Sequence, residues 1–202
     1  LTALNTSQTV MLDGVGINPM DNFIYGMRRD GGATNQLWVV ADDGIRQFKG
    51  LVSGITPWMQ AGAFADDGFL YVKKNGNNTT FQKIDVHGLT ATTIPLSSSC
   101  NFKDMAYHSA NGLFYAVSTA GTIGLISIDP ATGAVVLIGN NGAQNQDAVY
   151  SSSDGTIYAQ ATTGVVYKWD ITDGSQEIAS ADPSYNLSNN LYDGASCGLI
   201  TL

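Results

Sequence analysis

Asn22-Phe23-Ile24-Tyr25 is the first of four short apolar segments that end in tyrosine. The other three are Gly68-Phe69-Leu70-Tyr71, Gly112-Leu113-Phe114-Tyr115 and Gly155-Thr156-Ile157-Tyr158, and the tyrosines lie 46, 44 and 43 residues apart. Self-similarity at a fixed period of this size is typical of repeat architectures. The chain therefore predicts successive copies of one supersecondary unit.

Two turn signals recur in every copy. Each of the four tyrosines is preceded, four positions back, by an aspartate or asparagine, namely Asp21, Asp67, Asn111 or Asp154. A later strand-like segment ends in Asp42, Asp85, Asp129 or Asp170, and a glycine follows it at Gly44, Gly88, Gly133 or Gly174. Asp or Asn followed by Gly favours tight hairpins, because such turns need positive φ angles. Two hairpins per copy predict four short antiparallel strands.

Four-stranded repeats of about 40 to 50 residues have the size of β-propeller blades. The sequence predicts fourth strands at 45–48, 89–94, 134–138 and 175–178. We therefore expect an all-β, five-bladed propeller-like ring that forms a single domain over residues 1–202. Its blades would occupy about 13–54, 60–99, 104–142 and 147–190, with a fifth from 193–202 plus 1–12.

The fifth blade is predicted to be incomplete. Asp193 would open its first strand, and Leu1-Thr2-Ala3-Leu4, which matches Leu89-Thr90-Ala91-Thr92, would form its fourth. Compared with the other copies, about twenty residues are missing, equal to a two-strand hairpin. Three explanations are open: truncation or processing of an upstream segment, a rearranged last blade, or strands donated by another chain.

Composition excludes several classes of function. Seventeen acidic and nine basic residues give a net charge of -8, too few basic residues to follow a phosphate backbone, so nucleic acid is not an expected partner. No apolar run reaches the roughly 18 to 20 residues that span a bilayer. The chain starts at Leu1 without a signal-like stretch, as expected for a mature or excised piece.

Three segments carry a family resemblance. They are Ile17-Asn18-Pro19 with Asn22-Phe23-Ile24-Tyr25, Ile128-Asp129-Pro130-Ala131-Thr132-Gly133, and Asp193-Gly194-Ala195-Ser196-Cys197. Together they resemble an uncharacterised propeller-like repeat domain of bacterial secreted and cell-surface proteins. The resemblance covers nearly the whole chain and implies a secreted or cell-surface location, but no activity. The chain departs from it in the first hairpin, which family members would carry upstream of Leu1.

We expect the starts of the first strands to meet at the mouth of the central channel. There, Asp13, Gln60, Asp104, Asp147 and Asp193 would bring four carboxylates and one amide into register. A ring of oxygen ligands suits Ca²⁺, so a calcium site is one interpretation. In the other, each side chain bonds backbone N–H groups of its own loop, a structural role that repeats with the blade.

Aromatic residues and cysteines have two interpretations each. Trp58 and Phe102 both lie two residues before a ring position, where they would bind a sugar or an apolar side chain, or else cap the gap between blades. Cys100 and Cys197 could form one disulfide, which spacing alone does not decide. Four more aromatic residues are predicted to pack between blades: Trp38, Tyr107, Tyr150 and Trp169.

Catalytic motifs are missing from the sequence. It has no Gly-x-Ser-x-Gly, no phosphate-binding glycine loop, no His-Glu-x-x-His and no Cys-x-x-Cys. His87 and His108 are predicted to be surface turn residues. We therefore expect a non-enzymatic binding or adhesion module that contacts a protein or glycan through loops on one face. The alternatives are a structural subunit that accepts strands from a neighbouring chain, and a hydrolase or lyase acting on polysaccharide.

Overall fold

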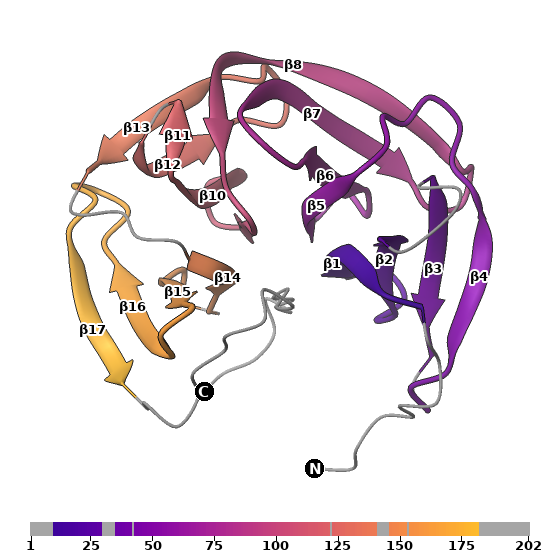
Figure 1. Ribbon diagram of the computed structural model, residues 1–202, viewed down its shortest axis with the longest axis horizontal. Coiled ribbons are helices and arrows are strands. Elements are labelled where there is room, and N and C mark those ends of the chain that lie inside the picture. Colours follow the sequence, from indigo (N-terminus) through magenta and orange to yellow (C-terminus); the bar gives the residue numbers. More distant parts are fainter. Residues whose placement is uncertain are drawn as a thin grey trace.

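The computed structural model describes residues 10–29, 35–41, 43–121, 123–140, 146–152 and 154–181. Every regular element in these ranges is a β-strand. The strands form four antiparallel sheets arranged as blades around a common axis (Figure 1). Within these ranges no helix is long and apolar enough to cross a membrane. The fold is a β-propeller in which four blades are described.

The strands of each blade follow one another along the chain. The first blade holds β1 (Leu12–Ile17), β2 (Ile24–Arg28), β3 (Gln36–Val40) and β4 (Arg46–Leu51). The second holds β5 (Met59–Phe64), β6 (Leu70–Lys74), β7 (Asn78–Asp85) and β8 (Thr90–Asn101), with β11 (Ala120–Gly121) paired to the end of β8. The third holds β9 (Ala106–His108), β10 (Leu113–Ser118), β12 (Gly124–Ile128) and β13 (Val135–Gly139). The fourth holds β14 (Gln146–Ser151), β15 (Ile157–Ala161), β16 (Val165–Trp169) and β17 (Gln176–Ala181).

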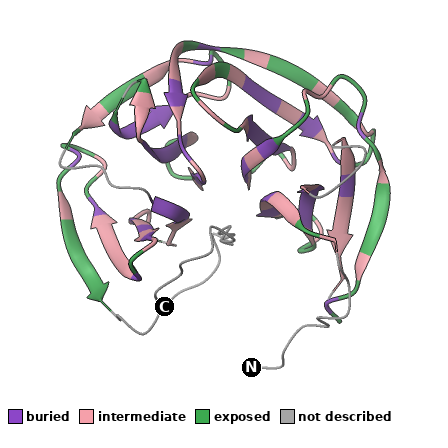
Figure 2. Ribbon diagram, viewed as in Figure 1, coloured by how far each residue is buried: buried purple, intermediate pink, exposed green. Residues whose placement is uncertain are grey.

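Four strands per repeat confirm the prediction from the two hairpin signals. In each blade the first strand lies nearest the axis and the fourth lies at the rim (Figure 1). Figure 2 shows that exposed residues gather on the rim strands, such as β4 and β17, whereas buried residues lie on the inner strands. Tyr25, Tyr71 and Tyr115 each mark the buried second strand of their blade.

Three apolar clusters fill the spaces between neighbouring blades. The cluster between the second and third blades contains Tyr71, Phe81 and Phe114, whose ring centroids lie 4.9 to 5.6 Å apart. Rings at this separation attract one another beyond the benefit of burial alone. Similar clusters join the first blade to the second and the third to the fourth. Packing between blades, rather than within one sheet, therefore forms the core.

The inner strands of the first two blades approach each other closely at two glycines. A Cβ at Gly62 on β5 would overlap the backbone of Gly14 on β1. The inner strands thus lie backbone against backbone at this point, a contact that a side chain at Gly62 would prevent.

The structure describes four blades, whereas the sequence predicted five. Residues 193–202 and most of 1–12, from which the fifth blade was predicted, lie outside the described residues. Among the described residues the ring is open between the first and fourth blades (Figure 1).

Two tyrosines at equivalent sequence positions point to opposite faces of their blades. Tyr107 pairs with Phe114 and packs into the core between the second and third blades, as predicted. Tyr150 instead pairs with Tyr158, so it lies on the face of the fourth blade that is turned away from the third. The hairpin after Tyr150 is one residue longer, and a one-residue change of register reverses every side chain.

Candidate functional site

The hairpin aspartates have a structural task in their own turns. Asp21 accepts hydrogen bonds from the backbone N–H of Phe23 at 3.0 Å and from the hydroxyl of Tyr25 at 2.8 Å. In the second copy, Asp67 makes both contacts with Phe69 and Tyr71. In the third, Asn111 donates to the hydroxyl of Tyr115 at 2.8 Å. In the first three blades, the hydrogen bond between the Asp or Asn and the Tyr therefore locks the first hairpin.

The second set of hairpin aspartates behaves in the same way. The carboxylates of Asp85, Asp129 and Asp170 accept backbone N–H groups two residues further on, at 2.7 to 2.9 Å. The pKa of each of the three carboxyls lies below its usual value, because hydrogen bonds stabilise the charged form. The largest contribution comes from the backbone N–H of Gly88 at Asp85, and from the hydroxyls of Thr132 and Thr172 at Asp129 and Asp170, with the N–H groups two residues further on adding to it. Their turn role accounts for their recurrence.

Asp104 and Asp147 connect the third blade to the fourth. Asp104 is fully buried, and its Oδ2 accepts the backbone N–H of Val149 at 2.7 Å. Asp147 is almost as buried, and its Oδ1 lies 2.5 Å from the Nζ of Lys103. Each carboxylate thus contacts the blade next to its own.

The other ring positions have different partners. Asp13 lies 3.3 Å from Nη1 of Arg29, yet burial raises the pKa of the Asp13 carboxyl more than this guanidinium lowers it. Gln60 is half-buried, and its Oε1 has no hydrogen-bond partner among the described residues. Asp193 lies outside the described residues. Over the described ranges, no three His, Cys, Asp or Glu side chains lie together as metal ligands would. The calcium ring stays a prediction.

Phe102 does not lie on an exposed face. It is 1% exposed, belongs to the core between the second and third blades, and its ring centroid lies 4.9 Å from Nζ of Lys73. That ammonium also donates to the carbonyls of Lys74 at 3.0 Å and Gly76 at 2.8 Å. Of the two interpretations, the structure places Phe102 as a cap between blades.

Burial also changes two ionisable groups beside this ring. The buried position of Lys73 lowers the pKa of its ammonium to about 8. Burial raises the pKa of the Cys100 thiol to about 11, although the charge on Lys73 opposes the shift. Cys197, the predicted disulfide partner of Cys100, lies outside the described residues, so the disulfide stays a prediction.

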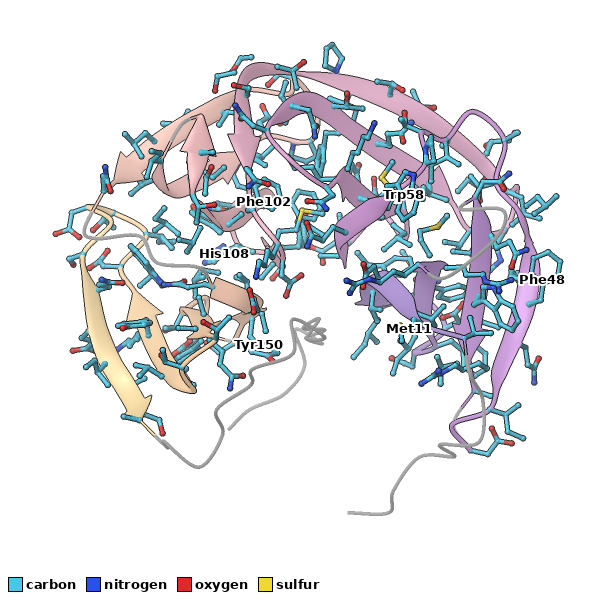
Figure 3. All side chains as sticks on the ribbon, in the orientation of Figure 1. Met11, Phe48, Trp58, Phe102, His108 and Tyr150 are labelled. Atoms are coloured by element: carbon cyan, nitrogen blue, oxygen red, sulfur yellow. The ribbon has the colours of Figure 1, made fainter. Side chains whose placement is uncertain are left out.

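Trp58 is the exposed one of the two predicted aromatic residues. Its side chain is 60% exposed, and its backbone has a φ of 70°, in the left-handed region. Its carbonyl accepts the N–H of Asn75 at 3.1 Å, which ties the loop between the first two blades to the turn after β6. Figure 3 shows Trp58 and the exposed Met11 on neighbouring blades, each just before an inner strand. The two therefore lie at the same face of the ring.

A pocket of about 440 Å³ lies at the opposite face, beside the hairpins of the fourth blade. Sequence reasoning missed this pocket and placed His108 on the surface, whereas His108 is only 7% exposed and lines it. The reason is Gly155, against which the Nε2 of His108 lies so closely that a Cβ there would overlap it. The described residues that line the rest of the pocket are Asp154, Thr156, Lys168, Trp169, Asp170, Ile171, Ser175, Gln176 and Glu177.

Comparisons with known proteins agree with the fold and leave the activity open. A family model described as a repeat of unknown function (DUF6923) matches residues 1–199. No curated protein matches the chain.

Similar solved structures include three proteins with unrelated names. A chain of the nidogen/laminin complex is 17% identical with a TM-score of 0.61, and the alignment covers 87% of this chain and 65% of that one. Hydrazine synthase of Kuenenia stuttgartiensis is 16% identical with a TM-score of 0.57, and the alignment covers 87% of this chain and 53% of that one. Streptogramin B lyase is 13% identical with a TM-score of 0.58, and the alignment covers 96% of this chain and 61% of that one. The chain therefore spans less than two thirds of each of these structures. Likeness at this identity shows the propeller fold alone.

Proposed function

We propose that this chain, which belongs to the DUF6923 repeat family, is a non-enzymatic binding or adhesion module that acts outside the cell. Its contact surface would be the face of the ring that carries Trp58, and its ligand a protein or a glycan. The conformation of Trp58 is the observation that carries this proposal.

Trp58 combines two costs that a purely structural residue would avoid. A non-glycine residue in the left-handed region costs of order 1 to 3 kcal/mol, and such strain gathers at ligand sites. An indole that is 60% exposed also leaves apolar surface in water. Tryptophan is enriched among the residues that dominate binding energies, which makes a ligand contact the function that best accounts for both costs.

The buried carboxylates give less support to a polysaccharide hydrolase or lyase. Such an enzyme needs an acid and a base that both reach the substrate. Asp104 is fully buried against Val149, and Asp147 is paired with Lys103. Neither arrangement presents a carboxylate to a polymer.

An array of extracellular proteins and glycans, probed with labelled protein, tests the proposal. The wild type should retain at least one ligand that Trp58→Ala loses. Phe48→Ala is the matched control, because Phe48 is 52% exposed on the rim strand β4, away from the proposed face. Equal loss in both variants, or no loss in Trp58→Ala, would sink the proposal.

The half-buried face of the first blade favours a second candidate function. Val15, Ile17, Ile24, Trp38 and Val40 are all partly exposed apolar residues of β1, β2 and β3. A fifth, incomplete blade that accepts strands from a neighbouring chain would cover this face and produce fibres or oligomers. Light scattering over a concentration series is the test, since a monomer at all concentrations excludes this candidate.

A further inference from the structure

The second blade fills one position of its first hairpin with an aromatic ring. Asp67 accepts the backbone N–H of Phe69 at 3.1 Å through Oδ1, and the Nζ of Lys83 at 2.7 Å through Oδ2. The same Nζ lies 4.0 Å from the ring centroid of Phe69. Carboxylate, ammonium and ring thus form one packed cluster.

The fourth blade has the aspartate and the lysine of this cluster, its frame, but lacks the aromatic ring. Asp154 corresponds to Asp67 and accepts the N–H of Thr156 at 3.0 Å. Lys168 corresponds to Lys83, because each lysine pairs across the sheet with the recurring tyrosine of its blade. Thr156 stands where the second blade has Phe69.

A pocket lies beside Thr156. Asp154, Thr156 and Lys168 all line the pocket of about 440 Å³, a volume that suits a small ligand. The side chain of Lys168 is 45% exposed, compared with 31% for Lys83 beneath its ring. Lys168 lies 3.4 Å from Glu177 instead of bonding the hairpin aspartate. The ammonium therefore keeps an open side toward the pocket.

We propose that this pocket binds an aromatic side chain, Phe or Tyr, of a partner polypeptide, and that the ring lies against Lys168 as Phe69 lies against Lys83. The chain itself shows that this frame of aspartate and lysine accepts such a ring. A lysine ammonium over an aromatic face is attracted by the ring quadrupole.

The neighbouring strand points to a polypeptide as the source of the ring. Gln176 and Glu177 of the pocket wall begin β17, which is the outermost strand of its sheet in the described part of the chain. An outermost strand offers backbone groups with which an extended segment can pair. A side chain could then enter the pocket from that segment.

An NMR titration with N-acetylphenylalanine amide tests the proposal, with N-acetylleucine amide as the non-aromatic control. The aromatic probe should shift the amide signals of Thr156, Lys168 and Ser175 in a saturable way, and the leucine probe should bind several-fold more weakly. Lys168→Met keeps the apolar stem and should weaken the aromatic probe about two- to five-fold. Equal binding of both probes, or no change in Lys168→Met, would overturn the proposal.

Thr156→Phe supplies the ring from the chain itself. The second blade already carries phenylalanine at this position, so the variant should fold and should abolish probe binding. Thr92→Phe, which adds the same ring at an exposed position of β8 outside the pocket, should bind as the wild type does. Retained binding in Thr156→Phe would contradict the assigned position of the ring.

Two further outcomes identify a different occupant. Tyr185 and Tyr192 lie outside the described residues, and replacing either by alanine should leave the probe's affinity unchanged. A several-fold gain in affinity would assign the pocket to the chain's own tyrosine and overturn the proposal of a partner. If benzyl alcohol bound as tightly as N-acetylphenylalanine amide, the site would be assigned to a free aromatic compound. That result would also overturn the proposal of a partner.

Discussion

Asp104 of the third blade accepts the backbone N–H of Val149 in the fourth, at 2.7 Å. This hydrogen bond crosses from one blade to the next through a fully buried carboxylate. Because an N–H left without an acceptor in the core is costly, Asp104→Ala should lower the free energy of unfolding by about 2 to 3 kcal/mol. Asp104→Asn retains an acceptor and should lose less. Urea unfolding of both variants measures the difference, and equal losses would contradict an acceptor role.

Lys73 predicts an unusual dependence of stability on pH. Burial lowers the pKa of its ammonium from 10.5 to about 8, so between these values the unfolded chain binds the proton that the folded chain has released. Stability rises with pH wherever the unfolded state binds more protons. The wild type should therefore gain up to about 3 kcal/mol relative to Lys73→Met as pH rises from 8 to 10.5.

Unfolding by urea at several pH values measures this gain. The pKa of the Cys100 thiol depends on the Lys73 charge, so both proteins carry Cys100→Ala, which removes that titration from the comparison. Parallel pH profiles for the wild type and Lys73→Met would show that the buried ammonium keeps its ordinary pKa.

At position 58, glycine should be tolerated better than alanine. Its φ of 70° is natural for glycine and strained for any residue with a Cβ. Trp58→Gly should therefore be more stable than Trp58→Ala by about 1 kcal/mol, because alanine keeps the strain. Thermal unfolding of the pair provides the measurement. An alanine variant as stable as the glycine variant would remove the strain argument for a ligand-binding role.

Gly62 separates the effect of packing from that of backbone conformation. A Cβ at Gly62 would overlap the backbone of Gly14, whereas Gly76 has a φ of 87° and nothing within 4 Å of an added Cβ. Gly62→Ala should cost about 3 kcal/mol or more through overpacking, and Gly76→Ala about 1 kcal/mol through strain. Chemical denaturation measures the free energy of unfolding of both variants. A smaller loss in Gly62→Ala than in Gly76→Ala would show that the inner strands are free to move apart.

The sequence was sufficient to predict the blade and its hairpins. The recurrence of Tyr25, Tyr71 and Tyr115 at a near-constant spacing, each four residues after an Asp or Asn, reflects a side-chain lock that the structure contains in every one of these copies. A contact between residues so close in the chain is encoded locally, which is why the pattern predicted it.

Side-chain direction could not be predicted from spacing. Trp58 and Phe102 both lie two residues before a ring position, yet the first is 60% exposed and the second 1% exposed. The left-handed backbone at Trp58 and the buried Lys73 beside Phe102 decide this difference, and both depend on tertiary contacts. Likewise, one extra hairpin residue after Tyr150 reverses its face relative to Tyr107.

One sequence feature of the pocket could be interpreted only with the structure. Thr156 replaces the Phe23, Phe69 or Leu113 of the other copies, a change that looks like ordinary surface variation. The cluster of Phe69 with Lys83 shows what such a residue does in a complete copy. The lack of a large apolar side chain at Thr156 therefore indicates a binding site only when its neighbours are known.

Isothermal titration calorimetry with the ligand selected by the array tests the central claim most directly. Trp58→Ala should weaken binding at least about ten-fold, as expected for a tryptophan at the centre of an interface, while Phe48→Ala should stay within about two-fold of the wild type. An affinity of Trp58→Ala equal to that of the wild type would contradict the account, because the exposed and strained indole would then have no part in recognition.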